Sequence, residues 1–326
     1  MWSHQNRLKS SLCMLLTVLA PPVFAQTYPT KPIRFIVGFA PGGPNDIVAR
    51  IVSQKLTESF GLPVTVDNRP GADSMIGTQM AARAAPDGYT ISMISASATI
   101  HPSVSASVPY DVAKDFSHVT LLASTAFIVV VNPTLPVKSI KDLIALAKKR
   151  PGQLNFASSG TGGSLHLAGE LFKSLAHVDM NHIPYKGGAP AANDVIGGQV
   201  ELMFSPIPVA MPHVKSGRLR ALAVTGSKRW PTSPDLPTVA ESGVPGYDVT
   251  GWYGIVAPAR TPGAIVMRLN QEIVKMLALS DVRQQFASFD LEPIGSSPEQ
   301  MASHVNAELV KWANVVRDAK IPRATQ

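Results

Sequence analysis

The feature that most constrains the fold is a strand that runs directly into a glycine turn and then a helix. The β-branched and aromatic run Ile33–Phe39 is typical of a strand covered on both faces, and Ala40-Pro-Gly-Gly43 ends it with residues that tolerate unusual backbone angles. Pro44 suits a first helical position, because its missing N–H would have no partner there. Backbone N–H groups at such a helix start point at an open position, which attracts anions.

A second copy of this unit follows later in the chain. Gln153–Ala157 is the strand, Ser158–Gly163 the glycine turn, and Ser164–Ala176 the helix. A single Gly-Gly turn is most simply a tight connection. Two equivalent turns predict a pair of anion-binding loops that face each other.

Each copy opens a longer βαβαβ pattern, so we predict an α/β protein with two lobes. The roughly 300 residues of the expected mature chain also exceed the usual size of one hydrophobic core. A new unit is expected to begin at Phe127–Val131. The chain crosses between lobes near Ala126 and again along Val249–Ala257, which predicts a hinge of two strands. We assign residues 26–125 and 255–326, with both terminal helices, to lobe 1 and residues 126–254 to lobe 2.

The first 25 residues have the pattern of a secretory signal peptide. Arg7 and Lys9 precede the apolar run Leu12–Ala20, and Val23-Phe-Ala25 is a small-residue cleavage site. The apolar run is shorter than the ~20 residues that span a bilayer. The one cysteine, Cys13, lies in this segment, so no disulfide is expected afterwards. We expect a periplasmic protein, soluble after cleavage near Ala25.

Composition argues against two other classes of function. The net charge of +7 includes the two cations of the signal segment, and the remaining Lys and Arg are scattered without a basic, aromatic-rich stripe, which argues against nucleic-acid binding. The turn after Phe39 lacks the Gly-Lys-Ser/Thr of a phosphate loop and the spacing of a dinucleotide fingerprint. We expect no cofactor and no metal.

Eight motifs in order resemble the periplasmic solute-binding proteins of tripartite tricarboxylate transporters, the Bug family. They span the expected mature chain: Tyr28-Pro29, Lys31-Pro-Ile33, Phe39–Asp46, Asn68-Arg-Pro-Gly-Ala72, Pro86-Asp-Gly-Tyr89, Ser158–Ser164, Pro184-Tyr-Lys-Gly187 and Gly251-Trp-Tyr-Gly254. The resemblance implies a type II-like Venus-flytrap fold that closes on a small mono- or dicarboxylate, aromatic acids included. It also implies delivery to membrane transporter subunits, and we expect a monomer.

The resemblance further implies that both glycine loops hold the carboxylate. The expected ligand-binding residues are Phe39, Ala40, Gly42, Gly43, Asp46, Ser97, Ser158, Gly160, Thr161, Gly163, Ser164, Asp194 and Ser205. Neither loop contains Arg or Lys, so dipoles and N–H donors are expected to neutralise the anion. Many relatives have an Asn near the end of the third strand, where this chain has Ser95–Thr99, so the identity of the acid stays open.

For several residues the sequence leaves two roles open. Asp46 is negative beside an anion site, so it is expected to orient the loop more than to contact ligand. Ser164 either contacts ligand or caps its helix. Asp194 either orients the second loop or accepts a hydrogen bond from the ligand. Phe39 and Trp252 either flank the ligand or belong to the core.

Two other functions remain as alternatives. Ser164, His166 and Asp194 include the residue types of a hydrolase triad, but a nucleophile elbow needs Gly two residues after the Ser, where this chain has His166. His166 and Glu170 could share a metal, although a surface pair is the simpler interpretation. The second alternative is a receptor that presents its solute to a membrane sensor.

Overall fold

The computed structural model describes residues 28–185, 187–318, 320–321 and 323, so the predicted signal peptide lies outside it. The strands are β1 (Ile33–Val37), β2 (Val64–Asn68), β3 (Thr90–Ser95), β4 (Phe116–Val131), β5 (Asn155–Ser158), β6 (Asn181–Pro184), β7 (Leu202–Pro206), β8 (Arg220–Val224), β9 (Thr250–Pro258) and β10 (Glu292–Pro293). The helices are α1 (Pro44–Phe60), α2 (Met75–Ala82), α3 (Ser97–Val104), α4 (Ile140–Lys149), α5 (Ser164–Ala176), α6 (Gly188–Ile196), α7 (Ile207–Lys215), α8 (Gly263–Leu277), α9 (Ser280–Ser288) and α10 (Pro298–Asp318).

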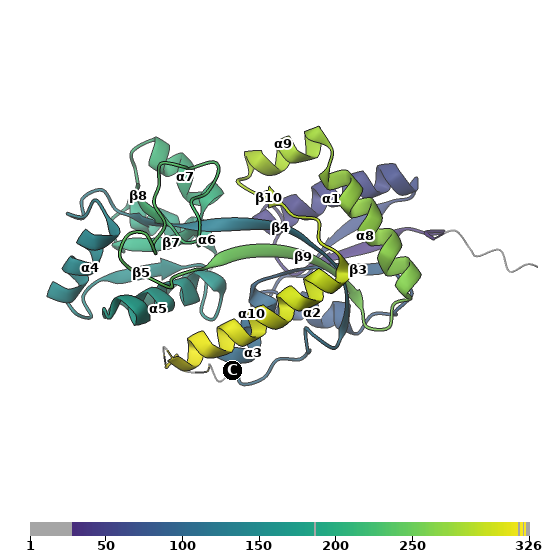
Figure 1. Cartoon of the computed structure of the whole chain (residues 1–326), viewed down its shortest axis with the longest axis horizontal. Helices are drawn as coiled ribbons and strands as arrows, with labels where there is room; N and C mark the ends of the chain where they lie inside the picture. Colours follow the sequence, from purple (N-terminus) through teal and green to yellow (C-terminus); the bar gives the residue numbers. More distant parts are fainter. Residues whose placement is uncertain (1–27, 186, 319, 322, 324–326) are drawn as a thin grey trace, which may run out of the picture.

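The fold has two lobes, as predicted, and each contains a small parallel sheet. The strand order is β2-β1-β3-β9-β4-β7-β5-β6, and β8 and β10 also pair with β4. In one lobe β2, β1 and β3 are parallel, and in the other β6, β5 and β7 are parallel. Helices gather around both ends of the molecule, and β4 and β9 run between them (Figure 1).

The long strand β4 belongs to both lobes. Its residues 116–126 pair with β9, its residues 127–131 pair with β7, and its residues 128–131 also pair with β8. Phe127–Val131 is therefore not a separate strand, because the same strand continues from Phe116, although its partners change at Phe127. Ser124 and Thr125 interrupt the apolar pattern without ending the strand. The lobe limits near 126 and 255 stay a prediction.

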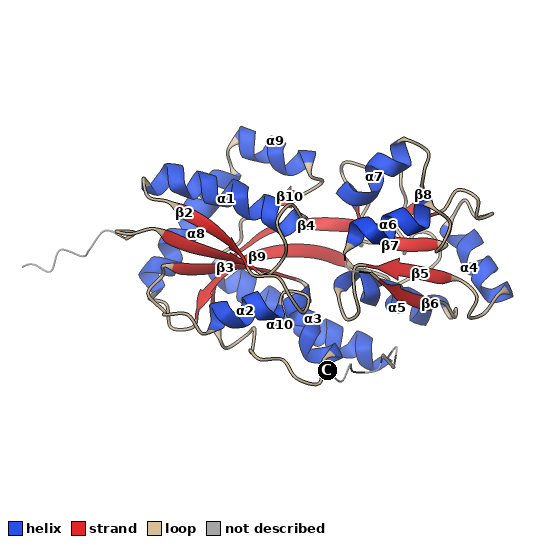
Figure 2. Ribbon diagram, turned by 180° about the vertical axis from the view of Figure 1, so that it is seen from behind, coloured by secondary structure: helices blue, strands red, loops and turns tan. Residues whose placement is uncertain are grey.

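Helices cover both faces of the sheet of the first lobe (Figure 2). α8 packs against α1 and β4, while α10 packs against α3 and β4. α10 starts with a capping box, because Ser297 Oγ accepts from the Gln300 N–H at 3.2 Å and Gln300 Oε1 accepts from the Ser297 N–H at 2.9 Å. Met301, Val305 and Trp312 then bury one face of α10 completely.

The glycine in the middle of α5 lets the helix approach the sheet. A Cβ at Gly169 would lie 2.2 Å from Cε2 of Phe156 on β5, well inside van der Waals contact. A Cβ at Gly263, the first residue of α8, would meet no atom within 4 Å among the described residues. The two glycines thus differ in available space: Gly169 lies inside its helix against Phe156, whereas Gly263 lies at the open start of α8.

We therefore expect Gly169→Ala to destabilise the protein by about 1–3 kcal/mol, because overpacking against Phe156 outweighs the better helix propensity of alanine. Urea unfolding monitored by circular dichroism measures this. Gly263→Ala is the control and should be neutral or slightly stabilising. Equal free energies of unfolding for the two variants would contradict the packing argument.

Candidate functional site

The first glycine loop, between β1 and α1, is held in shape by Asp46. Gly42 has φ of +82°, where glycine is favoured, and its N–H donates to Asp46 Oδ2 at 2.9 Å. Arg50 donates to the same oxygen at 2.9 Å, and the Asn68 amide donates to Oδ1 at 2.9 Å and to the Phe39 carbonyl at 3.0 Å. The carboxylate thus orients the loop, and the N–H of Gly42 is already in use.

Asp46 is only 2% exposed, yet it is held in its charged form. Burial opposes ionisation, but the hydrogen bonds from Arg50, Gly42 and Asn68 together outweigh it and lower the pKa of the carboxyl below its usual value. The negative charge beside the expected anion site is therefore satisfied internally.

The second glycine loop, between β5 and α5, repeats this geometry with a different acceptor. Gly162 also has φ of +82°, and its N–H donates to His166 Nδ1 at 3.1 Å. Gly43 and Gly163, the N-cap residues, have nearly equal angles (φ −81°, ψ 169° and φ −84°, ψ 172°). His166 thus occupies the position that Asp46 has in the first loop.

His166 stacks on a second histidine beneath the loop. The rings of His166 and His182 are 3.9 Å apart between centroids, and the Phe156 ring lies 5.0 Å from the His182 ring and 6.4 Å from the His166 ring. His182 Nε2 lies 2.6 Å from Ser158 Oγ, which accepts from the Gly160 N–H at 3.2 Å. The expectation that His166 and Glu170 form a surface pair is wrong, because His166 is only 8% exposed and supports the loop.

Both imidazoles are held neutral. Burial, aided by the charge of Lys173, lowers the pKa of His166 to about 4. Burial, together with His166 and Lys173, lowers the pKa of His182 to about 3. A neutral His166 is also what the hydrogen bond requires, since only an unprotonated Nδ1 can accept the N–H of Gly162.

A short segment between β2 and α2 lies against both loops. Ala72, Asp73 and Ser74 have positive φ angles of 46°, 48° and 77°. A Cβ at Gly38, in the first loop, would lie 2.6 Å from Ser74 Cβ, and a Cβ at Gly163 would lie 3.2 Å from Asp73 Oδ2. The segment 72–74 thus brings the two loops to one place. In the sequence, only the motif that ends at Ala72 indicates this segment, and Asp73 is not among the expected ligand-binding residues.

The other predicted residues occupy three kinds of position. Ala40, Gly42 and Thr161 are exposed; Phe39, Gly43, Gly160, Ser164 and Asp194 are half-buried; Asp46, Ser97, Ser158, Gly163 and Ser205 are buried. Ser164 does not cap α5, because Gly163 is the N-cap and has no side chain.

Asp194 and Trp252 have partners inside the protein. Asp194 accepts a 2.7 Å hydrogen bond from the Tyr185 hydroxyl; burial of that hydroxyl and this bond raise the pKa of Tyr185 to about 12. Trp252 is 3% exposed and donates to Glu308 on α10 at 3.3 Å, so it belongs to the core. Within the described ranges, no group of three or more His, Cys, Asp or Glu side chains is placed to hold a metal.

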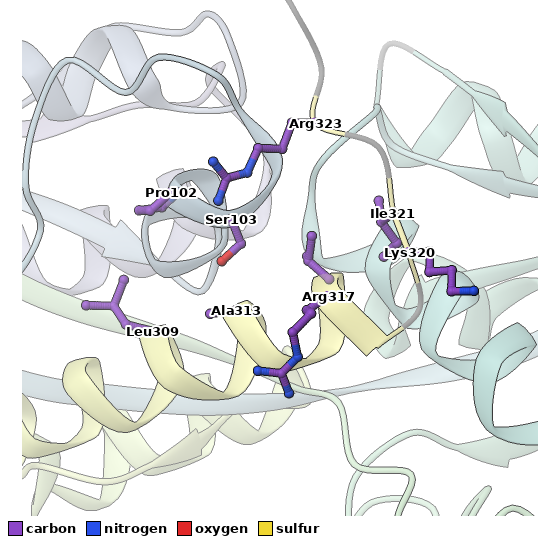
Figure 3. A pocket seen from close by; sticks show the side chains of 9 residues that line it. Pro102, Ser103, Leu309, Ala313, Arg317, Lys320, Ile321 and Arg323 are labelled. Atoms are coloured by element: carbon purple, nitrogen blue, oxygen red, sulfur yellow. The ribbon is translucent and has the colours of Figure 1, made fainter.

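A cavity of about 440 Å³ lies elsewhere, between α3, α10 and the residues that follow α10. Its lining residues are Pro102, Ser103, Leu309, Ala313, Val316, Arg317, Lys320, Ile321 and Arg323 (Figure 3). None of these belongs to either glycine loop, so the cavity is separate from the candidate site.

We expect the protein to lose stability as the pH falls from about 6.5 to 4. In the unfolded chain a histidine has a pKa near 6.5, whereas His166 titrates near 4 when folded, so the unfolded state binds more protons in this range. Each histidine of the stack should cost about 1–3 kcal/mol of unfolding free energy. Urea unfolding at a series of pH values measures the loss.

His166→Asn is the matched variant, because the amide oxygen can still accept from Gly162 but does not titrate. Its stability should fall less over the same pH range. A pH dependence equal to that of the wild type would mean that His166 is not held neutral by the fold.

Most of the chain matches one family. A family model described as the tripartite tricarboxylate transporter family receptor matches residues 48–321. The protein BugT of Bordetella pertussis is 39% identical over 302 residues, which cover 92% of this chain and 93% of BugT.

Solved structures give the same result. A structure from R. palustris with adipate has a TM-score of 0.85 at 36% identity, and the match covers 92% of this chain and 100% of that one. MatC from Rhodopseudomonas palustris with bound malate has a TM-score of 0.80 at 30% identity, covering 89% of this chain and 100% of MatC.

Members of this family are periplasmic solute-binding receptors and not enzymes, so the hydrolase alternative is wrong. In the described part of the chain, no helix is both long and apolar enough to cross a membrane. Sequence and fold together place this chain in the tripartite tricarboxylate transporter receptor family, the Bug family.

Proposed function

We propose that the protein captures a small carboxylate between its two glycine loops and delivers it to a tripartite tricarboxylate-type membrane transporter. The observation that carries this proposal is the repeated loop. Two glycine turns of the same backbone shape begin α1 and α5, neither helix has a side-chain cap, and the segment 72–74 lies against both. Uncapped helix starts leave backbone donors for an anion.

The chemistry of the loops favours an anion that is bound without a formal countercharge. Arg50, on α1 beside the first loop, is already paired with Asp46 at 2.9 Å. In the second loop the histidines are held neutral by burial. Helix dipoles and N–H groups supply the attraction, which supports reversible capture and release.

The relatives supply candidate ligands. One solved relative holds adipate and another holds malate, both of which are dicarboxylates. We propose that this chain takes an acid of similar size, with the glycine loops on one of its carboxylates.

Closure is proposed to occur about the two strands that join the lobes. β4 pairs with β9 up to Ala126 and with β7 from Phe127 onward, so a change of twist at this point would rotate one lobe against the other. We place residues 26–125 and 255–326 in lobe 1 and residues 126–254 in lobe 2. The closed form is what the membrane partner would recognise.

The glycine-loop assignment predicts that Gly43→Val weakens binding of the carboxylate at least about tenfold, a loss of about 1.4 kcal/mol. Gly43 has φ of −81°, and a Cβ there would lie 3.7 Å from the Ala40 carbonyl, so the fold should accept the side chain. The valine would then cover the start of α1. Isothermal titration calorimetry measures the change.

Gly263→Val is the control, because it makes the same substitution at the start of α8, remote from the loops. It should bind as the wild type does. Unchanged affinity in a folded Gly43→Val protein would sink the glycine-loop assignment.

A thermal-shift screen of mono-, di- and tricarboxylates and aromatic acids tests the ligand class. An acid at 100 times its dissociation constant should add about 2.7 kcal/mol to the free energy of unfolding. The amide of each hit is the control and should give no shift. Absence of any acid-dependent shift, with no acid released on denaturation by mass spectrometry, would show that carboxylates are not the ligands.

A further inference from the structure

One acidic side chain lies at the place where the two loops meet. Asp73 belongs to the left-handed segment 72–74, and its Oδ2 lies 3.2 Å from where a Cβ would stand at Gly163, the N-cap of α5. At most helix starts, the N-cap side chain folds over the first turn and accepts one of its N–H groups. Gly163 has no such side chain, and Asp73 approaches that place from the other lobe.

Two buried side chains, His101 and Tyr110, hold the Asp73 carboxylate in place. His101 Nε2 lies 3.2 Å from Asp73 Oδ2, and His101 Nδ1 lies 2.9 Å from the Tyr110 hydroxyl. His101 is 2% exposed and Tyr110 is 6% exposed, so the chain Asp73–His101–Tyr110 runs from the site into the core of lobe 1. The backing side chains hold Oδ2 in one position.

The other carboxylate oxygen is left for a ligand. The Asp73 side chain is 33% exposed, and within the described part of the chain Oδ1 receives no hydrogen bond. An ionised carboxylate only accepts hydrogen bonds, so it favours a donor and repels a second carboxylate placed beside it. No Lys or Arg forms an ion pair with Asp73 among the described residues, whereas Asp46 has Arg50.

We propose that Asp73 selects acids that carry a hydrogen-bond donor, a hydroxyl or an ammonium group, next to the bound carboxylate. This inference rests on the proposed function, in which the glycine loops hold the carboxylate. The loops hold the anion, and Asp73 Oδ1 accepts from the neighbouring donor. An acid with no donor at that position leaves Asp73 unpaired beside a like charge.

Matched sets of acids test this selection by calorimetry. Succinate, malate and aspartate have the same four-carbon frame with a hydrogen, a hydroxyl or an ammonium group on the second carbon. Propionate, lactate and alanine form the monocarboxylate set, and phenylacetate, mandelate and phenylglycine form the aromatic set. In the set that binds, we expect a hydroxyl or ammonium member to bind at least about tenfold more tightly than the member without a donor.

Asp73→Asn removes the charge and keeps the backbone, because Asn is tolerated at positive φ. It should reduce the preference to about threefold or less, mainly by improving the binding of the donor-free acid. Asp67→Asn is the control: Asp67 carries the same charge in the preceding strand but pairs with Arg34 and Arg69. It should keep the wild-type preference.

The outcomes separate the two proposals. Equal binding of all members of a set by the wild type, or an unchanged preference in folded Asp73→Asn, overturns the role of Asp73 and leaves carboxylate capture intact. Failure of every acid in all three sets to bind the wild type, together with no acid-dependent thermal shift in the wider screen, overturns the proposed function, and the selection by Asp73 falls with it.

Discussion

The site depends on one backbone constraint, a glycine that turns its N–H back into the protein just before a helix starts. Gly42 and Gly162 share φ of +82°, a left-handed conformation that glycine adopts without strain. Each gives its N–H to the fourth residue onward, Asp46 or His166. With that N–H fixed, the next glycine begins the helix without a side-chain cap, and the first turn stays open to an anion.

The two loops have one shape but different electrostatics. In the first, a buried carboxylate is held charged by Arg50 and by amide donors. In the second, a neutral imidazole takes the same position and stacks on another imidazole, with Glu170 3.8 Å away where the first loop has its arginine. One loop is therefore insensitive to mild acid, whereas the other carries groups whose protonation opposes the folded geometry.

The lobes are linked both by the continuous strand β4 and by contacts at the site. A Cβ at Gly162 would lie 3.2 Å from Val104 Cγ2 of α3, and a Cβ at Gly163 would lie 3.2 Å from Asp73 Oδ2. The second loop therefore rests on lobe 1 and needs glycine for this approach. The same contact places Asp73 at the start of α5, so the lobe closure and the ligand selection that we propose would both involve this segment.

The repeated strand, glycine turn and helix determined the fold class and both loops from the sequence alone, because glycine and proline act locally and apolar periodicity reports burial along one element. The continuity of β4 through Ser124 and Thr125 could not be read this way, since pairing with β9 on one side and β7 on the other stabilises a strand that its own pattern interrupts. The positive φ angles of Ala72, Asp73 and Ser74 could not be read from the sequence either, because contacts with the glycine loops support them. The burial of His166 and the approach of Asp73 to Gly163 join residues far apart in the chain, and only tertiary packing decides such neighbours.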